Sequence, residues 1–267
     1  PFASLERARM AVRKVAPEMR QDIVVYFRGG TYAMDQPVRF DSLDSGRGEH
    51  QIIYKNYPGE TPVFSGGTAV RNWGHYEGGI YRAFVGKEVD FRQIYVDNKK
   101  AVRARHPNRG ELLTIPMKKT AGGFNLEQGV LVGVEAVEDT IEVAVKNEWM
   151  LQRLRIRRWV DSEGHTHVEI NPVEWKALLE GPQANRKYAG RSYWLENAFE
   201  FIDTPGEWYL NRKDGYLYYY PRAEEGPAQS EVIIPRLEQF IVLNGTFDRP
   251  VENLVFSGLE FNYSNWT

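Results

Sequence analysis

The chain has 267 residues, of which 42% are hydrophobic, and its 34 lysines and arginines nearly balance its 36 aspartates and glutamates. This length accommodates one large core or two domains of ordinary size. The near-neutral charge argues against a dedicated nucleic-acid-binding protein, which needs a basic excess to neutralise phosphates. No apolar run approaches the roughly 18 residues of a membrane-spanning helix. The absence of cysteine excludes disulfides and thiolate metal sites.

The first predicted element is a short amphipathic helix. Its candidate N-cap is Ser4, Pro17 lies beyond its end, and its apolar positions are Leu5, Ala8, Val12 and Val15. The chain opens with neither an initiator methionine nor an apolar signal segment. We therefore expect it to be a processed or excised piece.

Short strands separated by sharp corners follow this helix. Runs of three to six residues, rich in β-branched and aromatic types and each followed by a turn sequence, occupy 22–27, 37–40, 51–54 and 62–64. The pattern returns at 231–235, 240–243 and 253–261, where LVFSGLEF resembles the earlier PVFSGG. Such strands, repeated at a coil length of about twenty-odd residues, are typical of a β-solenoid. The alternative is an antiparallel sandwich, but the N-terminal strands lack Asn-Gly or Asp-Gly hairpin loops.

The region from about 70 to 230 has a different pattern. Alternating residues predict longer strands at 140–145 and 153–157, and a hairpin joins 207–210 to 217–220. Its one helical candidate spans about 173–180, between Pro172 and Gly181. We therefore predict an antiparallel β-domain at 70–229, inserted between two pieces of one solenoid at 1–69 and 230–267.

Several separated motifs occur in an order that resembles a known group of enzymes. They are PFASLERARMAVRKV, DIVVYFRGGTY, YPGETPVFSGG, RARHPN, LENAFEFIDTPGEWYLNRKDGYLYYYP, and IPRLEQFIVLNGT followed by PVENLVFSGLEF. The chain resembles the N-terminal half of bacterial right-handed parallel β-helix carbohydrate-active enzymes of the pectin-lyase-like type, nearest to glycoside hydrolase families 141 and 120. The resemblance implies a mainly β fold, in which the first coils of a right-handed parallel β-helix have an N-terminal helical cap and carry the inserted antiparallel β-domain.

The same resemblance implies a secreted or periplasmic enzyme that acts on plant or bacterial oligosaccharides or polysaccharides. In that group the catalytic carboxylates lie on later coils, so we expect them beyond residue 267 and expect this piece alone to be inactive. A solenoid cut between repeats leaves an apolar face and unpaired strand edges. We therefore expect the last coil, around Leu254 to Phe261, to be exposed or covered by a further β-helix segment or another chain.

Acidic residues within the chain are weaker catalytic candidates. Glycoside hydrolysis needs two carboxyl groups, roughly 5–5.5 Å apart for retention of configuration or 6.5–9.5 Å apart for inversion. Glu196, Glu200, Asp203 and Glu207 lie in one stretch, and the spacing of the first two would place them on one helical face. Of these we single out Glu200 and Glu207. The alternative is that both hold backbone or arginine partners.

Four residues are candidates for substrate binding: Arg103, Arg105, His106 and Trp266. The two arginines share a face if the segment is extended, and a guanidinium can bind carboxylates or sugar hydroxyls. His106 is a candidate wall of a sugar subsite, and Trp266 is a ring on which a sugar could stack. The alternatives are a structural turn for 103–108 and core or cap packing for Trp266.

Other charged patterns favour structural interpretations. Arg153, Arg155 and Arg157 alternate along a strand and could hold a uronic-acid glycan, but pairing with acids such as Glu142 or Glu169 is favoured. The two histidines of the sequence GHTH at 164–167 lack a clear third ligand, so we assign no metal. No phosphate-binding or dinucleotide signature occurs, and we predict no cofactor.

The leading interpretation is therefore the N-terminal part of a glycoside hydrolase. One alternative is a β-helix polysaccharide lyase. The sequence has no acidic cluster with calcium-loop spacing, which argues against a lyase that uses calcium. The other is a carbohydrate-binding or structural module without catalysis.

Overall fold

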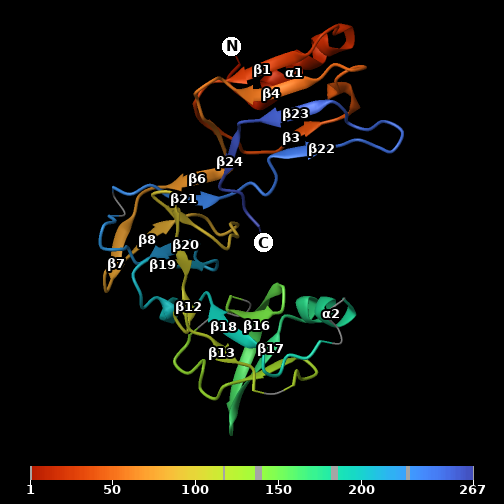
Figure 1. The fold of residues 1–267 in the computed structure, drawn as a ribbon. Coiled ribbons are helices and arrows are strands. Elements are labelled where there is room, and N and C mark those ends of the chain that lie inside the picture. Colours follow the sequence, from red (N-terminus) through yellow and green to blue (C-terminus); the bar gives the residue numbers. More distant parts are fainter. Residues whose placement is uncertain (1, 117, 136–139, 182–185, 227–228, 267) are drawn as a thin grey trace. The chain divides into compact units, whose positions relative to one another are not determined.

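The computed structural model describes residues 2–116, 118–135, 140–181, 186–226 and 229–266 (Figure 1). The fold is mainly β with a helix at its N-terminal end, as the sequence predicts. The chain divides into two compact units. Unit 1 consists of Pro1–Ala69, Phe91–Tyr95 and Val232–Thr267, and unit 2 consists of Val70–Asp90 and Val96–Glu231. Within the described residues, no helix is long and apolar enough to cross a membrane.

Unit 1 begins with helix α1 (Leu5–Val15), which starts at the predicted N-cap. The backbone N–H of Arg7 donates to Oγ of Ser4 at 3.3 Å, which satisfies one of the free donors of the first turn. Leu5, Ala8 and Val12 are buried in the core of unit 1, whereas Val15 is exposed. A 3₁₀ turn, η1 (Ala16–Glu18), ends the helix.

Eight described strands of unit 1 pair in parallel, in three groups. The first group is β1 (Ile23–Phe27), β4 (Ile52–Asn56) and β23 (Leu254–Ser257); the second is β2 (Gly30–Ala33), β5 (Pro62–Ser65) and β24 (Glu260–Asn262); the third is β3 (Val38–Phe40) and β22 (Ile241–Leu243). The antiparallel sandwich therefore does not describe this unit. The sequence pattern does not predict β2, because Gly29 and Gly30 favour a turn.

Aromatic side chains follow this parallel register. Tyr54 stacks on Phe256 at a centroid distance of 5.4 Å. In the second group Tyr32 stacks on Phe64 at 5.1 Å, and Phe64 stacks on Phe261 at 5.4 Å. Each strand thus covers the apolar side chains of its neighbour, which is how stacked repeats bury a core.

Unit 2 consists mostly of antiparallel strands in two sheets, so the sheets of the whole chain are mixed. The five-stranded sheet has the order β11-β19-β20-β8-β7, with only β11 and β19 parallel. Its strands are β7 (Gly74–Glu77), β8 (Ile80–Phe84), β11 (Val102–Arg103), β19 (Glu207–Asn211) and β20 (Tyr216–Tyr219). The predicted hairpin is confirmed as β19 and β20.

The seven-stranded sheet has the order β12-β18-β15-β16-β17-β14, and β13 also pairs with β18. Its strands are β12 (Arg105–His106), β13 (Leu113–Thr114), β14 (Gly123–Leu126), β15 (Glu142–Asn147), β16 (Met150–Ser162), β17 (His165–Ile170) and β18 (Ser192–Glu196). The predicted helix is confirmed as α2 (Pro172–Glu180), whose N-cap Asn171 accepts the N–H of Val173 at 3.0 Å. The remaining elements are β6 (Gly67–Val70), β9 (Tyr95–Val96), β10 (Lys99–Lys100), β21 (Val232–Pro235), η2 (Ser42–Asp44) and η3 (Phe199–Phe201).

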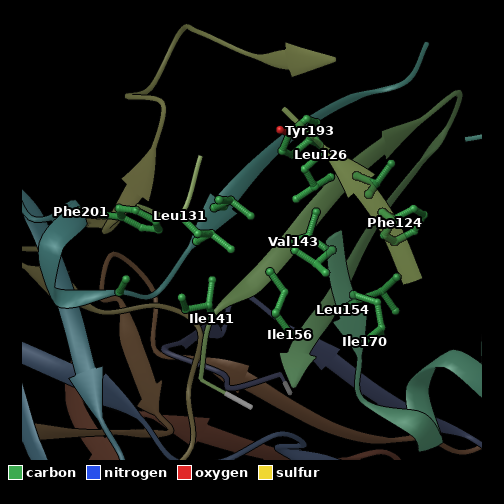
Figure 2. Close-up of a cluster of buried hydrophobic side chains, with 14 of the residues drawn as sticks. Phe124, Leu126, Leu131, Ile141, Val143, Leu154, Ile156, Ile170, Tyr193 and Phe201 are labelled. Carbon is green, nitrogen blue, oxygen red and sulfur yellow. The ribbon is translucent and has the colours of Figure 1, made fainter. Parts of the chain in front are cut away.

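The core of unit 2 lies largely on the seven-stranded sheet and also includes Ile80, Tyr209 and Tyr218 of the five-stranded sheet. Figure 2 shows its central side chains, among them Phe124 and Leu126 of β14, Val143 of β15 and Ile156 of β16. These four residues are fully buried. The sheet is therefore a rigid support for the charged side chains at the ends of its strands.

Candidate functional site

Arg103, a predicted binding residue, lies in a buried group of charged side chains in unit 2. Glu142 begins β15, Glu196 ends β18, and the antiparallel register places these two residues opposite each other. Nη1 of Arg103 lies 2.8 Å from Oε2 of Glu142 and 3.6 Å from Oε2 of Glu196. All three residues are buried. One guanidinium thus bridges two carboxylates that would otherwise repel each other in a water-poor site.

Arg153 and Trp194 complete this group, which we call the Arg103 cluster (Arg103, Glu142, Arg153, Trp194 and Glu196). Nε of Arg153 donates to Oε2 of Glu196 at 2.9 Å, and Nε1 of Trp194 donates to Oε1 at 2.5 Å. Both oxygens of Glu196 therefore have donors inside the protein. The arrangement joins strand ends and does not present this carboxyl to a sugar.

Arg105 and His106 form β12, beside β18. Cζ of Arg105 lies 4.4 Å from the ring centroid of Trp194, and its Nε donates to the carbonyl oxygen of Pro107 at 2.9 Å. Burial lowers the pKa of this guanidinium, although the nearby carboxylates oppose the shift. His106 is exposed, and its ring centroid lies 5.8 Å from that of Phe201. Arg105 is therefore held against the Arg103 cluster, whereas His106 is accessible to a ligand.

Glu207 is buried at the start of β19, with 2% of its surface exposed. Its Oε2 accepts the backbone N–H groups of Asp203 at 3.1 Å and Thr204 at 3.2 Å. Burial raises the pKa of Glu207 to about 7, although these hydrogen bonds act in the opposite direction. A pKa near neutrality suits a general acid. The contacts, however, hold the turn before β19, and the burial keeps a sugar away.

Glu200 is exposed in η3, and its Oε1 accepts the backbone N–H of Glu135 at 3.0 Å. Asp203 accepts a hydrogen bond from Nδ2 of Asn108 at 2.9 Å. Glu196 ends a strand while Glu200 lies in a 3₁₀ turn, so the expectation that they share a helical face is wrong. Asn197, directly after β18, has a φ of +67°, which a right-handed helix does not allow.

Trp266 belongs to unit 1, unlike the other predicted site residues. It is 44% exposed, and Cζ of Arg92 lies 5.4 Å from its ring centroid. Unit 1 also has a groove of about 530 Å³ lined by α1 and residues 32–39, with Arg7 and Arg39 among its lining residues. None of the predicted site residues lines this groove.

Arg153 and Arg155 of β16 pair with acids, as the favoured interpretation expects, and Glu169 pairs with Arg158 of the same strand. Arg153 contacts Glu196, and Nη2 of Arg155 lies 3.2 Å from Oδ2 of Asp90. Nδ1 of His167 lies 2.8 Å from Oδ1 of Asn125. Within the described part of the chain, no group of three or more His, Cys, Asp and Glu residues is placed to hold a metal ion.

Comparison with known proteins assigns part of the sequence to a family. The family model of the GH141 insertion domain matches residues 81–222, which is more than half of the chain. The chain belongs to the GH141 insertion-domain family. The predicted resemblance to glycoside hydrolase family 141 is thereby confirmed, whereas the resemblance to family 120 stays a prediction.

Two solved structures are similar to the chain. One, described as a glycoside hydrolase, is 27% identical and aligns with a TM-score of 0.88, over 100% of this chain and 48% of its own. The chain therefore spans about half the length of that glycoside hydrolase. The other, described as the complex structure of XylC with xylose, is 14% identical and aligns over 95% of this chain and 32% of its own, with a TM-score of only 0.37. No curated protein matches the chain.

The GH141 insertion domain contains all of the predicted site residues except Trp266. It also contains the whole Arg103 cluster, whose acids Glu142 and Glu196 were not singled out as partners of Arg103 from the sequence. Arg103 and Glu142 are 39 residues apart, and Arg153 and Glu196 are 43 apart. An alternating strand pattern marks which residues share a face, but it does not show which strand lies next to it.

Proposed function

We propose that this chain is the N-terminal portion of a glycoside hydrolase that acts on plant or bacterial oligosaccharides or polysaccharides. The observation that carries the proposal is the alignment of the whole chain with a glycoside hydrolase at a TM-score of 0.88. The GH141 insertion domain supports the same assignment. By the family resemblance, we place the enzyme in the periplasm or outside the cell.

We further propose that unit 1 is the start of a right-handed parallel β-helix with α1 as its cap. The three groups of parallel strands and the stacked rings of Tyr32, Phe64 and Phe261 support this architecture. In this proposal residues 1–69 form the cap and first coils, 70–229 form the inserted domain, and 230–267 continue the helix. Further coils, or another chain, would then cover β22, β23 and β24.

The proposed mechanism uses two carboxyl groups. One protonates the oxygen of the leaving sugar, and the other acts as a nucleophile or activates water. By the family resemblance we place both beyond residue 267. Within the chain, Glu142, Glu196 and Glu207 are buried and have partners in the protein. Glu200, which is exposed, is the remaining candidate of those singled out within the chain.

The residues proposed for substrate binding have different roles. His106 and Trp266 are exposed, so they are proposed to contact sugar directly. Arg103 and Arg105 lie deeper and are proposed to position β11 and β12 beneath the sugar. A His106→Ala variant with unchanged sugar affinity and turnover would remove that residue from the site.

A reducing-sugar assay on the longer protein tests the proposal. We expect polysaccharide hydrolysis to release reducing sugars without ultraviolet absorbance from an unsaturated product. An unsaturated uronate would instead identify a lyase. Glycan binding without any turnover would identify a binding module.

A further inference from the structure

A row of aromatic side chains crosses the five-stranded sheet of unit 2. Tyr216 of β20 lies opposite Phe84 of β8, with ring centroids 5.5 Å apart. Cζ of Arg82 lies 4.7 Å from the ring centroid of Tyr216 and 4.8 Å from that of Tyr76. We call Phe84, Tyr216, Arg82 and Tyr76 the aromatic row. Its guanidinium is therefore placed between two rings, which stabilises all three groups.

A β-bulge in β7 positions Tyr76, which lies at one end of the row. On β7, His75 pairs with Tyr81 and Glu77 pairs with Ile80, so Tyr76 is the extra residue of the irregularity. Bulges redirect side chains and are common beside functional sites. Gly74 lies opposite Arg82, and a Cβ atom at Gly74 would meet no heavy atom within 4 Å. The surface beside the guanidinium is therefore open.

Two rings of the row are exposed to solvent, and the row also contacts a buried tyrosine. Phe84 is 61% exposed and Tyr76 is 39% exposed, whereas Tyr218, opposite Arg82, is buried. The ring of Tyr218 lies 5.2 Å from that of Tyr76. Tyr216 is half-buried and packs against the core of unit 2, so Phe84 and Tyr76 are the rings that the row presents to solvent. Exposed aromatic surface of this kind can bind a ligand.

The polar groups of the row favour an uncharged ligand with many hydroxyls. Arg82 donates to the hydroxyl of Tyr218, and that hydroxyl lies 3.5 Å from Oδ2 of Asp214. A cation and an anion thus contact the same hydroxyl, so the charges beside the row are of both signs. A pyranose sugar has apolar CH faces, which can pack on aromatic rings, and hydroxyl groups at its edge, which can accept hydrogen bonds from a guanidinium.

We propose that the aromatic row binds a neutral, extended chain of pyranose sugars. The CH faces pack on Phe84 and Tyr76, and hydroxyls bond to Arg82 and Tyr216. The choice of a sugar as ligand rests on the proposed function of the chain, while the row does not contribute to hydrolysis. The site would hold a polysaccharide near the enzyme and raise its local concentration.

Calorimetric titration of the 267-residue protein with xylohexaose, cellohexaose and mannohexaose tests the proposal. We expect at least one of these neutral probes to bind, and Phe84→Ala and Tyr76→Ala each to weaken its binding roughly tenfold. Gly74→Leu removes no residue of the row but covers the face of Arg82, so it should weaken binding similarly. Its backbone conformation is open to other residues.

The matched control is Trp149→Ala. Trp149 is 77% exposed and also has an arginine over its ring, Arg186 at 4.7 Å, but it lies outside the row. We expect this variant to bind as the wild type does. The proposal is overturned if no neutral probe binds, if only hexagalacturonate binds, or if the row variants keep wild-type affinity. Hydrolysis is measured separately on the longer protein. A lack of hydrolysis would overturn the proposed function, whereas the binding measurements would still test the aromatic row.

Discussion

Arg103 is the residue on which the buried charges of unit 2 depend. Its side chain is 7% exposed and contacts two carboxylates, while Arg153 contacts Glu196. Removing one partner of a buried ion pair leaves an uncompensated charge, which costs far more than the pair contributes.

We expect Arg103→Ala to lower the free energy of unfolding by roughly 3–5 kcal/mol. Urea denaturation followed by tryptophan fluorescence would measure this loss. The matched control is Arg158→Ala, because Arg158 pairs with Glu169 but is 73% exposed. That surface pair should contribute less than about 1 kcal/mol. Equal losses in the two variants would show that the Arg103 cluster is not a buried ion-pair group.

Glu207 predicts a pH dependence of stability. Its pKa rises from the ordinary 4.5 to about 7 in the folded protein, so the folded state binds the proton more tightly. The contribution of this group is therefore fully present below pH 4.5 and is lost as the pH rises through 7. Glu207→Gln keeps an acceptor oxygen but cannot ionise.

The stability of Glu207→Gln relative to wild type should therefore increase between pH 4.5 and 7, by up to roughly 3 kcal/mol. Thermal unfolding across this range measures the difference. Glu163→Gln, at an exposed position, is the control. A constant difference between Glu207→Gln and wild type across the range would show that Glu207 is ionised throughout.

At the scale of single residues, the sequence indicates candidate positions but not their contacts. The motif RARHPN indicated Arg103, Arg105 and His106, and the structure places Arg103 on β11 of the five-stranded sheet and the other two on β12 of the seven-stranded sheet. Their partners could not be predicted, because Glu142 and Glu196 meet Arg103 only through the order of strands in the sheet. The burial of Glu207 could not be predicted either, because the turn before it is polar in the sequence.

Among the elements, α1 is linked to η2 by a buried aspartate. Asp44 is 1% exposed, and its carboxylate accepts hydrogen bonds from Arg9 at 2.9 Å and from Nε of Arg13 at 2.7 Å. Burial alone would raise the pKa of Asp44, but the hydrogen bonds and charges of both arginines hold it below its ordinary value. Its contribution to stability is therefore present at neutral pH and is lost as the pH falls through the lowered pKa.

We expect Asp44→Ala to destabilise the protein by roughly 3 kcal/mol, because two arginines lose their shared partner. Chemical denaturation measures the change. Glu6→Ala provides the comparison: Glu6 also pairs with Arg9, but its side chain is 41% exposed, and we expect a loss below about 1 kcal/mol. If both variants lose the same stability, Asp44 does not anchor α1.

The corner between β23 and β24 depends on Gly258. This residue has a φ of +63°, and an added Cβ atom would lie 2.1 Å from Oδ1 of Asn56. Gly59, between β4 and β5, has a φ of +78° but would meet no heavy atom within 4 Å. The two glycines thus separate the effect of backbone conformation from that of close packing.

Gly59→Ala should cost about 1–2 kcal/mol for the left-handed conformation alone. Gly258→Ala should cost that amount and roughly 1–3 kcal/mol more for the clash. Melting temperatures of the two variants would rank them. Equal melting temperatures would mean that Asn56 moves aside without cost.

For the whole molecule, the sequence predicted the class of fold and the change of pattern along the chain. Short strands with regular corners are a local signal, so most of those in unit 1 could be predicted, whereas β2 and β6 begin at glycines that favour a turn. The order of strands in unit 2 depends on contacts between distant segments, and no local pattern reports it. The family resemblance, not the periodicity, pointed to a glycoside hydrolase.

Hydrolysis by the longer protein, compared with the 267-residue chain, tests the central claim most directly. Both proteins would be incubated with the same plant and bacterial polysaccharides, and reducing sugar would be measured over time. We predict release by the longer protein and none by the 267-residue chain, because the proposed catalytic carboxylates lie beyond residue 267. Release by the 267-residue chain alone, or no release by the longer protein on any of these substrates, would contradict the account.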